Sequence, residues 1–167
     1  MKKLIDRRSI QWHTNRIAKA INENQHEDGR SAVFICLLNG GFMFFSDLVK
    51  QITFRLECDF FRIKSYEGQT QGEVQLLKDI ETNIENKHIY IIDDFLDTGE
   101  SMKYAIAHFK NKKPASISIA TLLIRENSPE FDIPSYDGLM LSDEWVVGYG
   151  LNGENGFSRN LLDIYKM

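Results

Sequence analysis

The sequence has few of the features that mark disulfide-bonded, zinc-binding or membrane-spanning proteins. Its two cysteines, Cys36 and Cys58, lie in separate apolar segments and form no CxxC pair. We therefore expect no disulfide framework and no zinc site, and we predict that both cysteines are buried, reduced thiols. The longest clean apolar run, AVFICLL, is far too short to span a bilayer.

Targeting signals and basic clusters are also scarce. The segment MKKLIDRRSI is basic, but no apolar stretch of the signal-peptide type follows it, so we expect a cytoplasmic protein without a membrane partner. Lys and Arg together number 20 against 24 Asp and Glu, and the formal net charge is −4. Proteins that bind nucleic acid usually carry a basic stripe, so nucleic acid is not an expected partner.

The chain is long enough and apolar enough to form a sizeable core. Its 167 residues, 43% of them hydrophobic, predict a single domain over residues 1–167. Continuous apolar runs predict strands buried on both faces at residues 31–38, 88–93 and 115–124. Helical spacing predicts a helix capped by Ser9 that ends near residues 27–30, and further helices over 42–52 and 99–109.

The remaining segments complete an α/β pattern. Residues 56–66 and 74–80 are predicted strands, and the polar, glycine-interrupted segment 67–73 between them is a predicted mobile loop. Because strands alternate with helices, we expect a mainly parallel sheet. The last third has short β-like pieces without helices, and we predict an antiparallel appendage beside the sheet.

The segment HIYIIDDFLDTGESM places three carboxylates, Asp93, Asp94 and Asp97, directly after an apolar run. Ligands of open α/β sheets bind at the carboxyl ends of the strands. The glycine turn at Gly99 would present free N–H groups to an anion. Like charges this close repel unless a cation or a donor-rich ligand is present. The pattern therefore predicts a site for a phosphorylated sugar with Mg²⁺.

Two other interpretations of the acidic segment compete with a phosphate and Mg²⁺ site. Asp97 alone is equally well explained as a helix cap, and the Asp93–Asp94 pair as a solvated turn. DDFLD also matches the DDxxD element of isoprenoid synthases, which lies on a long helix of a large all-helical fold. Here β-branched residues precede the acids and Thr-Gly follows them, so we reject the isoprenoid interpretation.

IYIIDDFLDTGESM resembles the phosphoribosyl-pyrophosphate signature of the type I phosphoribosyltransferases, and specifically that of their hypoxanthine-guanine branch. Further segments fit the same family in the same order, namely LLNGGFMFFSDLV, DFFRIKSYEG, SIATLLIRE and EWVVGYGLN with SRNL beyond it. The resemblance implies a mostly parallel, twisted sheet flanked by helices, with a small hood subdomain built from the N-terminal and C-terminal segments. It also implies transfer of a phosphoribosyl group to a purine base with Mg²⁺ as cofactor.

The resemblance also implies roles for individual residues. Asp97 would accept the proton of purine N7, and Asp93 and Asp94 would hold the ribose hydroxyls and the hydrated Mg²⁺. The 5′-phosphate would lie on the loop formed by Thr98, Gly99, Glu100 and Ser101. Pyrophosphate would contact Asn39, Gly40 and Arg159, after a non-proline cis peptide that the family often has. Ser65 and Tyr66 would belong to a lid, and the base would meet Arg125, Trp145 and Val146.

The sequence departs from the family pattern at four positions. Asn39 stands where Lys is usual, Asp93 where Glu is common, and Arg125 where Lys reads the purine 6-oxo group. Asn152 stands where an Asp coordinates a second Mg²⁺. Arg and Lys present different donor geometries, and a neutral Asn is a weaker magnesium ligand than a carboxylate.

Several alternatives stay open at this stage. Taken alone, Gly40-Gly41 is an ordinary turn, Trp145 and Tyr66 are ordinary structural aromatics, and Arg159 is a surface charge. The departures allow a regulator that binds phosphoribosyl pyrophosphate or a nucleotide without turnover, or a transferase for another base such as xanthine. The family implies a homodimer or homotetramer, although the FMFF segment is better explained by burial in the core. The four histidines show no metal-ligand spacing.

Overall fold

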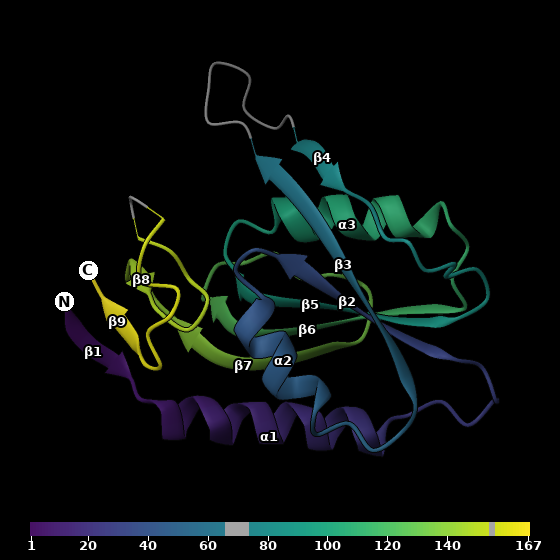
Figure 1. Ribbon diagram of the computed structural model, residues 1–167, viewed down its shortest axis with the longest axis horizontal. Helices are drawn as coiled ribbons and strands as arrows, with labels where there is room; N and C mark the ends of the chain where they lie inside the picture. The colour runs from purple at the N-terminus through teal and green to yellow at the C-terminus, as the bar shows by residue number, and fades with distance from the viewer. Residues whose placement is uncertain (66–73, 154–155) are drawn as a thin grey trace.

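The computed structural model describes residues 1–65, 74–153 and 156–167. Its larger sheet has six strands in the order β4-β3-β2-β5-β6-β7, and its smaller sheet has three in the order β1-β9-β8 (Figure 1). The elements in chain order are β1 (Lys2–Ile5), α1 (Arg7–Glu23), β2 (Ala32–Leu38), α2 (Phe42–Val49), β3 (Leu56–Ser65), β4 (Val74–Lys78), β5 (His88–Leu96), α3 (Glu100–Lys110), β6 (Ser116–Arg125), β7 (Ser135–Leu141), β8 (Val146–Val147) and β9 (Ile164–Lys166).

The larger sheet is mostly parallel, as the sequence predicts. Strands β3, β2, β5, β6 and β7 are parallel to their neighbours, and only the edge strand β4 is antiparallel. The prediction for the last third was partly wrong, because β7 belongs to this sheet and pairs parallel with β6. The connection 126–134 contains no helix. Parallel strands are usually joined through a helix, so the sequence lacked the helical spacing that would have indicated a parallel strand.

Alternation along the central strands assigns each side chain to one of two layers. Phe34 and Cys36 of β2 pack with the buried residues of α1 and α2. Val33 and Ile35 point the other way and pack with the buried face of α3. Helices α1 and α2 therefore cover one face of the sheet and α3 the other (Figure 1). Cover on both faces explains the unbroken apolar runs.

The helix boundaries correct three predictions. Helix α1 is capped by Asp6, whose carboxylate accepts from the Ser9 N–H at 2.8 Å. Ser9 therefore lies inside the helix, because the carboxylate three residues earlier satisfies its free N–H. The helix ends at Glu23, before the predicted end near residues 27–30, with Asn24 as C-cap. Helix α2 ends at Val49, before residue 52. Helix α3 matches its prediction to within one residue.

Two side chains predicted to be buried lie at the surface. Cys36 is buried, but Cys58 is exposed, because its neighbours Asp59 and Phe61 take the inward positions of β3. In the FMFF segment Phe44 and Phe45 are buried, whereas Phe42, in the first turn of α2, is 42% exposed.

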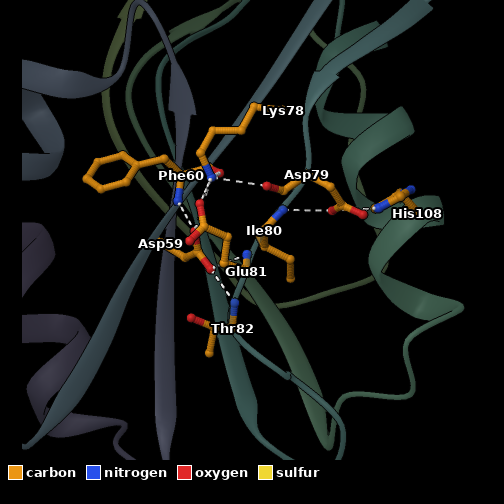
Figure 2. Close-up of polar contacts among 8 residues, drawn as sticks. All are labelled: Asp59, Phe60, Lys78, Asp79, Ile80, Glu81, Thr82 and His108. Carbon is orange, nitrogen blue, oxygen red and sulfur yellow. Dashed lines mark hydrogen bonds and ion pairs between the residues drawn. The ribbon is translucent and has the colours of Figure 1, made fainter.

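A buried carboxylate fastens the connection between β4 and β5 to the edge of the sheet (Figure 2). Asp59 of β3 is 5% exposed and accepts from the backbone N–H groups of Glu81 at 2.8 Å and Thr82 at 2.7 Å. Burial raises the pKa of Asp59, but its hydrogen bonds together outweigh burial and lower the pKa. Nearby, Asp79 bonds His108 of α3 at 3.0 Å. This network joins β3, the connection and α3.

The smaller sheet brings the two ends of the chain together. Strand β1 pairs antiparallel with β9, and β9 pairs antiparallel with β8. The N-terminal and C-terminal strands thus lie side by side (Figure 1). None of the described helices is long and apolar enough to cross a membrane.

Candidate active site

Two carboxylates lie close together near the carboxyl end of β5. The strand extends to Leu96, beyond its predicted end at residue 93, so Asp94 as well as Asp93 lies within it. Asp94 is 7% exposed, and its N–H donates to the Asp93 carboxylate at 2.9 Å. Burial raises the pKa of both groups, and the charge of Asp94 raises the pKa of Asp93 further. The pair would be relieved by a cation or by hydrogen-bond donors.

The turn after β2 touches this acidic pair. A non-proline cis peptide joins Leu38 and Asn39, and Gly40 and Gly41 follow. A Cβ atom at Gly40 would overlap the Asp94 carboxylate. Only glycine lets the backbone come this close, so the glycine turn of β2 and the acids of β5 form one rim.

A third segment, which contains Gly150, packs against the glycine turn after β2. Gly150, with φ of 99°, packs so closely on the Gly40 carbonyl that a Cβ atom would overlap it. The Gly150 N–H donates to the Arg159 carbonyl at 2.9 Å, and the Arg159 guanidinium donates back to the Gly150 carbonyl. The charge of Arg159 also acts to lower the pKa of Asp94, although burial outweighs it. Asn39, Gly40, Asp94 and Arg159 are therefore brought together.

Asp97 and Arg125 form an ion pair across the ends of β5 and β6. The Arg125 Nε–H donates to Asp97 Oδ1 at 3.0 Å, and Nη2 lies 3.4 Å from Oδ2. Nη1 donates to the backbone carbonyls of Ser142 and Glu144. The guanidinium carbon lies 4.7 Å from the centroid of the Phe95 ring. These contacts fix the orientation of the guanidinium and use four of its five N–H donors, so that one Nη2–H has no partner among the described residues.

The ion pair lies in a cavity of about 160 Å³ whose lining also includes residues from the C-terminal third. Trp145 is 61% exposed, which leaves its ring available to a ligand, while Val146 is 6% exposed and belongs to β8. Asn152 lines the same cavity, and its Nδ2 donates to the Gly153 carbonyl at 3.3 Å. Predicted base-binding residues that are distant in the sequence thus share one cavity.

Helix α3 begins at Glu100, after Asp97, Thr98 and the N-cap Gly99. Gly99 has φ of 77°, and no side chain among the described residues caps the helix. Thr98 and Glu100 are exposed and Ser101 is half-buried at this end. Uncapped N–H groups at a helix start form a ready site for an anion.

Some predicted residues are not placed at the site. Ser65 ends β3, but its side chain, Tyr66 and the predicted loop 67–73 lie outside the described residues. Conversely, sequence reasoning missed Phe95 as the aromatic surface beneath Arg125. Strand alternation was the signal that could have found it, because Phe95 and Asp97 are two residues apart at the end of β5.

The acidic pair also fits a hydrated Mg²⁺. The described residues contain no cluster of three or more His, Cys, Asp or Glu side chains that could hold a metal by themselves. Mg²⁺ typically uses one or two carboxylates and completes its shell with water and substrate phosphates. Asp93 and Asp94 supply this number of hard oxygen ligands, so the residues suit a metal that arrives with a phosphorylated substrate.

Comparisons with known proteins identify the family of this chain. The model of the phosphoribosyl transferase domain matches residues 3–154. A hypoxanthine-guanine phosphoribosyltransferase of Staphylococcus epidermidis is 43% identical over 131 residues, which cover 75% of this chain and 73% of the relative.

Solved structures resemble the whole fold. A hypoxanthine phosphoribosyltransferase from Staphylococcus aureus superposes with a TM-score of 0.90 at 36% identity, over 99% of this chain and 90% of that one. A hypoxanthine-guanine phosphoribosyltransferase from Bacillus anthracis also gives 0.90, at 32% identity, over 100% and 98%. The chain therefore belongs to the phosphoribosyl transferase domain family, and within it to the hypoxanthine-guanine phosphoribosyltransferases.

Proposed function

We propose that the protein transfers the phosphoribosyl group of 5-phosphoribosyl 1-pyrophosphate to a 6-oxopurine, releasing pyrophosphate and forming a purine nucleoside 5′-monophosphate for purine salvage. The observation that carries this proposal is the cavity that Asp97, Arg125 and Trp145 line together. The acidic pair and the uncapped start of α3 flank Asp97 along the chain. Relatives named hypoxanthine-guanine phosphoribosyltransferase support it further.

The donor would lie between the acidic pair and the start of α3. Asp93 and Asp94 would accept hydrogen bonds from the ribose hydroxyls. The N–H groups from Thr98 to Ser101, with the two hydroxyls, would bind the 5′-phosphate at the uncapped helix start. This places the sugar at the carboxyl end of β5, where open α/β sheets bind their ligands.

The leaving group would lie on the rim formed by Gly40 and Arg159. As the bond to the sugar breaks, positive charge develops on the ribose and negative charge on pyrophosphate, so fixed charges do most of the catalytic work. Asp93 and Asp94 would hold Mg²⁺, which offsets the charge of the departing pyrophosphate. Asn39 supplies no cation, and the charge of Arg159, which acts on Asp94, supports Arg159 as a cationic contact for pyrophosphate.

The Asp97–Arg125 pair matches the edge of a 6-oxopurine. Asp97 would accept the N7 proton as the general base, and the free Nη2–H of Arg125 would donate to O6. Adenine carries an amino donor in place of O6 and would face another donor. Trp145 would stack on the base, and the Val146 carbonyl would accept from it. The same contacts allow hypoxanthine, guanine or xanthine.

Further features belong to this proposal. By family resemblance, Ser65 and Tyr66 would belong to a lid that excludes water, and Asn152 would be a weak ligand of a second Mg²⁺. We propose that the protein works in the cytoplasm as a homodimer or homotetramer. The exposed ring of Phe42, at the start of α2, is available to such an interface.

A purine panel tests the proposal. Pyrophosphate release is measured with the phosphoribosyl donor, Mg²⁺ and each of hypoxanthine, guanine, xanthine and adenine. We expect release with 6-oxopurines, little with adenine, and none after chelation of Mg²⁺. Asp97→Asn should lower kcat by about 10²–10⁴-fold, whereas Asp132→Asn, at an exposed position, should not. Binding of the donor without turnover would instead indicate the regulator.

A further inference from the structure

A second polar cluster lies at the opposite end of the larger sheet from the candidate active site. The parallel strands β2, β3, β5 and β6 begin there, and in register Ala32 pairs with Leu56 and with His88, which in turn pairs with Ser116. Figure 1 shows these strand starts at the end remote from the three-stranded sheet. None of the described residues that were assigned to phosphoribosyl transfer lines this cluster.

The cluster is built around a buried histidine. His88 is 4% exposed, and both of its ring nitrogens are engaged, Nδ1 with Ser116 Oγ at 2.7 Å and Nε2 with the Asp28 carboxylate at 2.9 Å. The ring of His26 stacks on it, with centroids 3.6 Å apart and planes 4° from parallel. Asp28 also pairs with Arg30 at 2.7 Å. The loop after α1 is thereby fastened to the strand starts.

Beside this stack is a cavity of about 200 Å³, and none of the described residues that line it is acidic. Arg30 and Arg55 both line it, and Arg55 forms no hydrogen bond or ion pair with the described residues. Tyr90 lines it too and is 1% exposed, yet its hydroxyl has no hydrogen-bond partner within the described residues. The cavity is therefore lined by the unpaired Arg55, by Arg30 with its ion pair to Asp28, by the stacked imidazoles of His26 and His88, and by a tyrosine whose hydroxyl is unpartnered among the described residues.

We propose that this cavity is a binding site for a small phosphate-bearing anion. Guanidinium groups bind phosphate oxygens in a planar, bidentate manner, and the Tyr90 hydroxyl offers a further donor. Asp28 lies near, but its carboxylate is already engaged by His88 and Arg30. The site is separate from the residues proposed for phosphoribosyl transfer. Failure of the proposed function would therefore leave this proposal unaffected.

The histidines provide a local test in the full-length protein. The chain has four of them, and their imidazole C–H signals are assigned by single His→Gln variants. Inorganic phosphate is titrated at constant ionic strength against chloride. We expect saturable shifts of the His26 and His88 signals, with His13 and His108 as internal references. Shifts no larger than those in chloride would overturn the proposal.

Two variants connect the shifts to the cavity. Arg55→Ala should weaken phosphate binding at His26 and His88 at least tenfold, since hydrogen bonds to charged groups are among the stronger ones. Tyr90→Phe should weaken it in the same direction while keeping the buried ring. Arg8→Ala, at an exposed position in the first turn of α1, is the matched control. Unchanged binding in Arg55→Ala would refute the site.

A second titration with ribose 5-phosphate identifies the kind of ligand. Binding at least tenfold tighter than that of inorganic phosphate would assign the site to a phosphorylated sugar, and equal binding would assign it to phosphate itself. Both results support the site, provided that Arg55→Ala abolishes the difference from chloride.

Discussion

The hydroxyl of Tyr149 donates a hydrogen bond of 2.6 Å to the carboxylate of Asp47 and links the segment between β8 and β9 to helix α2. Tyr149 is 5% exposed and lies between Gly148 and Gly150, which both have positive φ. Burial raises the pKa of Tyr149, and the hydrogen bond to Asp47 raises it further. The contact supports the packing of the neighbouring Gly150 on the carbonyl of Gly40.

The first prediction concerns this contact. Tyr149→Phe removes only the hydroxyl and should lower the free energy of unfolding by about 1.5–3 kcal/mol, the range for hydrogen bonds to charged groups. Urea unfolding at neutral pH measures it. Tyr104→Phe, on α3 in a half-buried position, should change stability by less than about 0.5 kcal/mol. Equal effects of the two variants would mean that the Asp47 contact contributes nothing.

The second prediction concerns the turn after β2. Gly40→Ala drives a Cβ atom into the Asp94 carboxylate, and overpacking of this kind costs about 1–3 kcal/mol. Because the displaced groups belong to the proposed pyrophosphate site, kcat should fall together with stability. Gly153→Ala is the matched control, since its Cβ would lie 3.6 Å from Val147 Cγ1 in ordinary contact. A fully active Gly40→Ala enzyme would contradict the assigned rim.

The third prediction concerns base recognition. Arg125→Ala should lower kcat/KM for hypoxanthine about 10- to 200-fold, because the proposed donor to O6 is lost together with the partner of Asp97. Arg125→Lys should retain more activity than Arg125→Ala, although one ammonium group cannot make all the contacts of the guanidinium. Steady-state kinetics with hypoxanthine and adenine provide the measurement. Arg8→Ala, which keeps Arg125 intact, should behave as wild type.

The fourth prediction concerns the pH dependence of stability and the Asp59 carboxylate, which is labelled in Figure 2. The pKa of Asp59 is lowered in the folded state from its ordinary value of 3.8. Its ionised form therefore stabilises the fold fully above that value, and this stabilisation is lost as the pH falls toward the folded-state pKa. Asp59→Asn should be less stable than wild type at neutral pH by about 1–3 kcal/mol.

The comparison between wild type and Asp59→Asn isolates this group from other carboxylates. The difference in unfolding free energy should shrink as the pH falls below about 3.8. Asp132→Asn, at an exposed position, should show no such convergence. A difference that stayed constant with pH would show that the charge of Asp59 does not stabilise the fold.

The alternation of strands and helices was readable from the sequence because each core strand is covered on both faces. The unbroken apolar run of β2 and the helical spacing of α3 leave little room for another architecture. Strand β7 was misplaced because its connection 126–134 carries no helical signal. Ser9 was chosen as a cap because hydroxyls are common caps, but the Asp6 carboxylate is the acceptor.

The candidate site was predicted from motifs, but its contacts were not. The segment DDFLDTG indicated the acidic pair and the phosphate loop by itself. The pairing of Asp97 with Arg125, and the packing of Gly150 on Gly40, join residues far apart in the chain. Such contacts depend on how the strands and loops pack in three dimensions. No local sequence motif indicates which distant residues will be in contact.

The most direct measurement of the central claim is the stoichiometry of the products. With hypoxanthine, phosphoribosyl pyrophosphate and Mg²⁺, chromatography should show inosine 5′-monophosphate and pyrophosphate appearing in equal amounts. Asp97→Asn should slow the appearance of both products together. If the protein released pyrophosphate without any nucleotide, or formed neither product, then the cavity beside Asp97 would not be a purine site and the account would be contradicted.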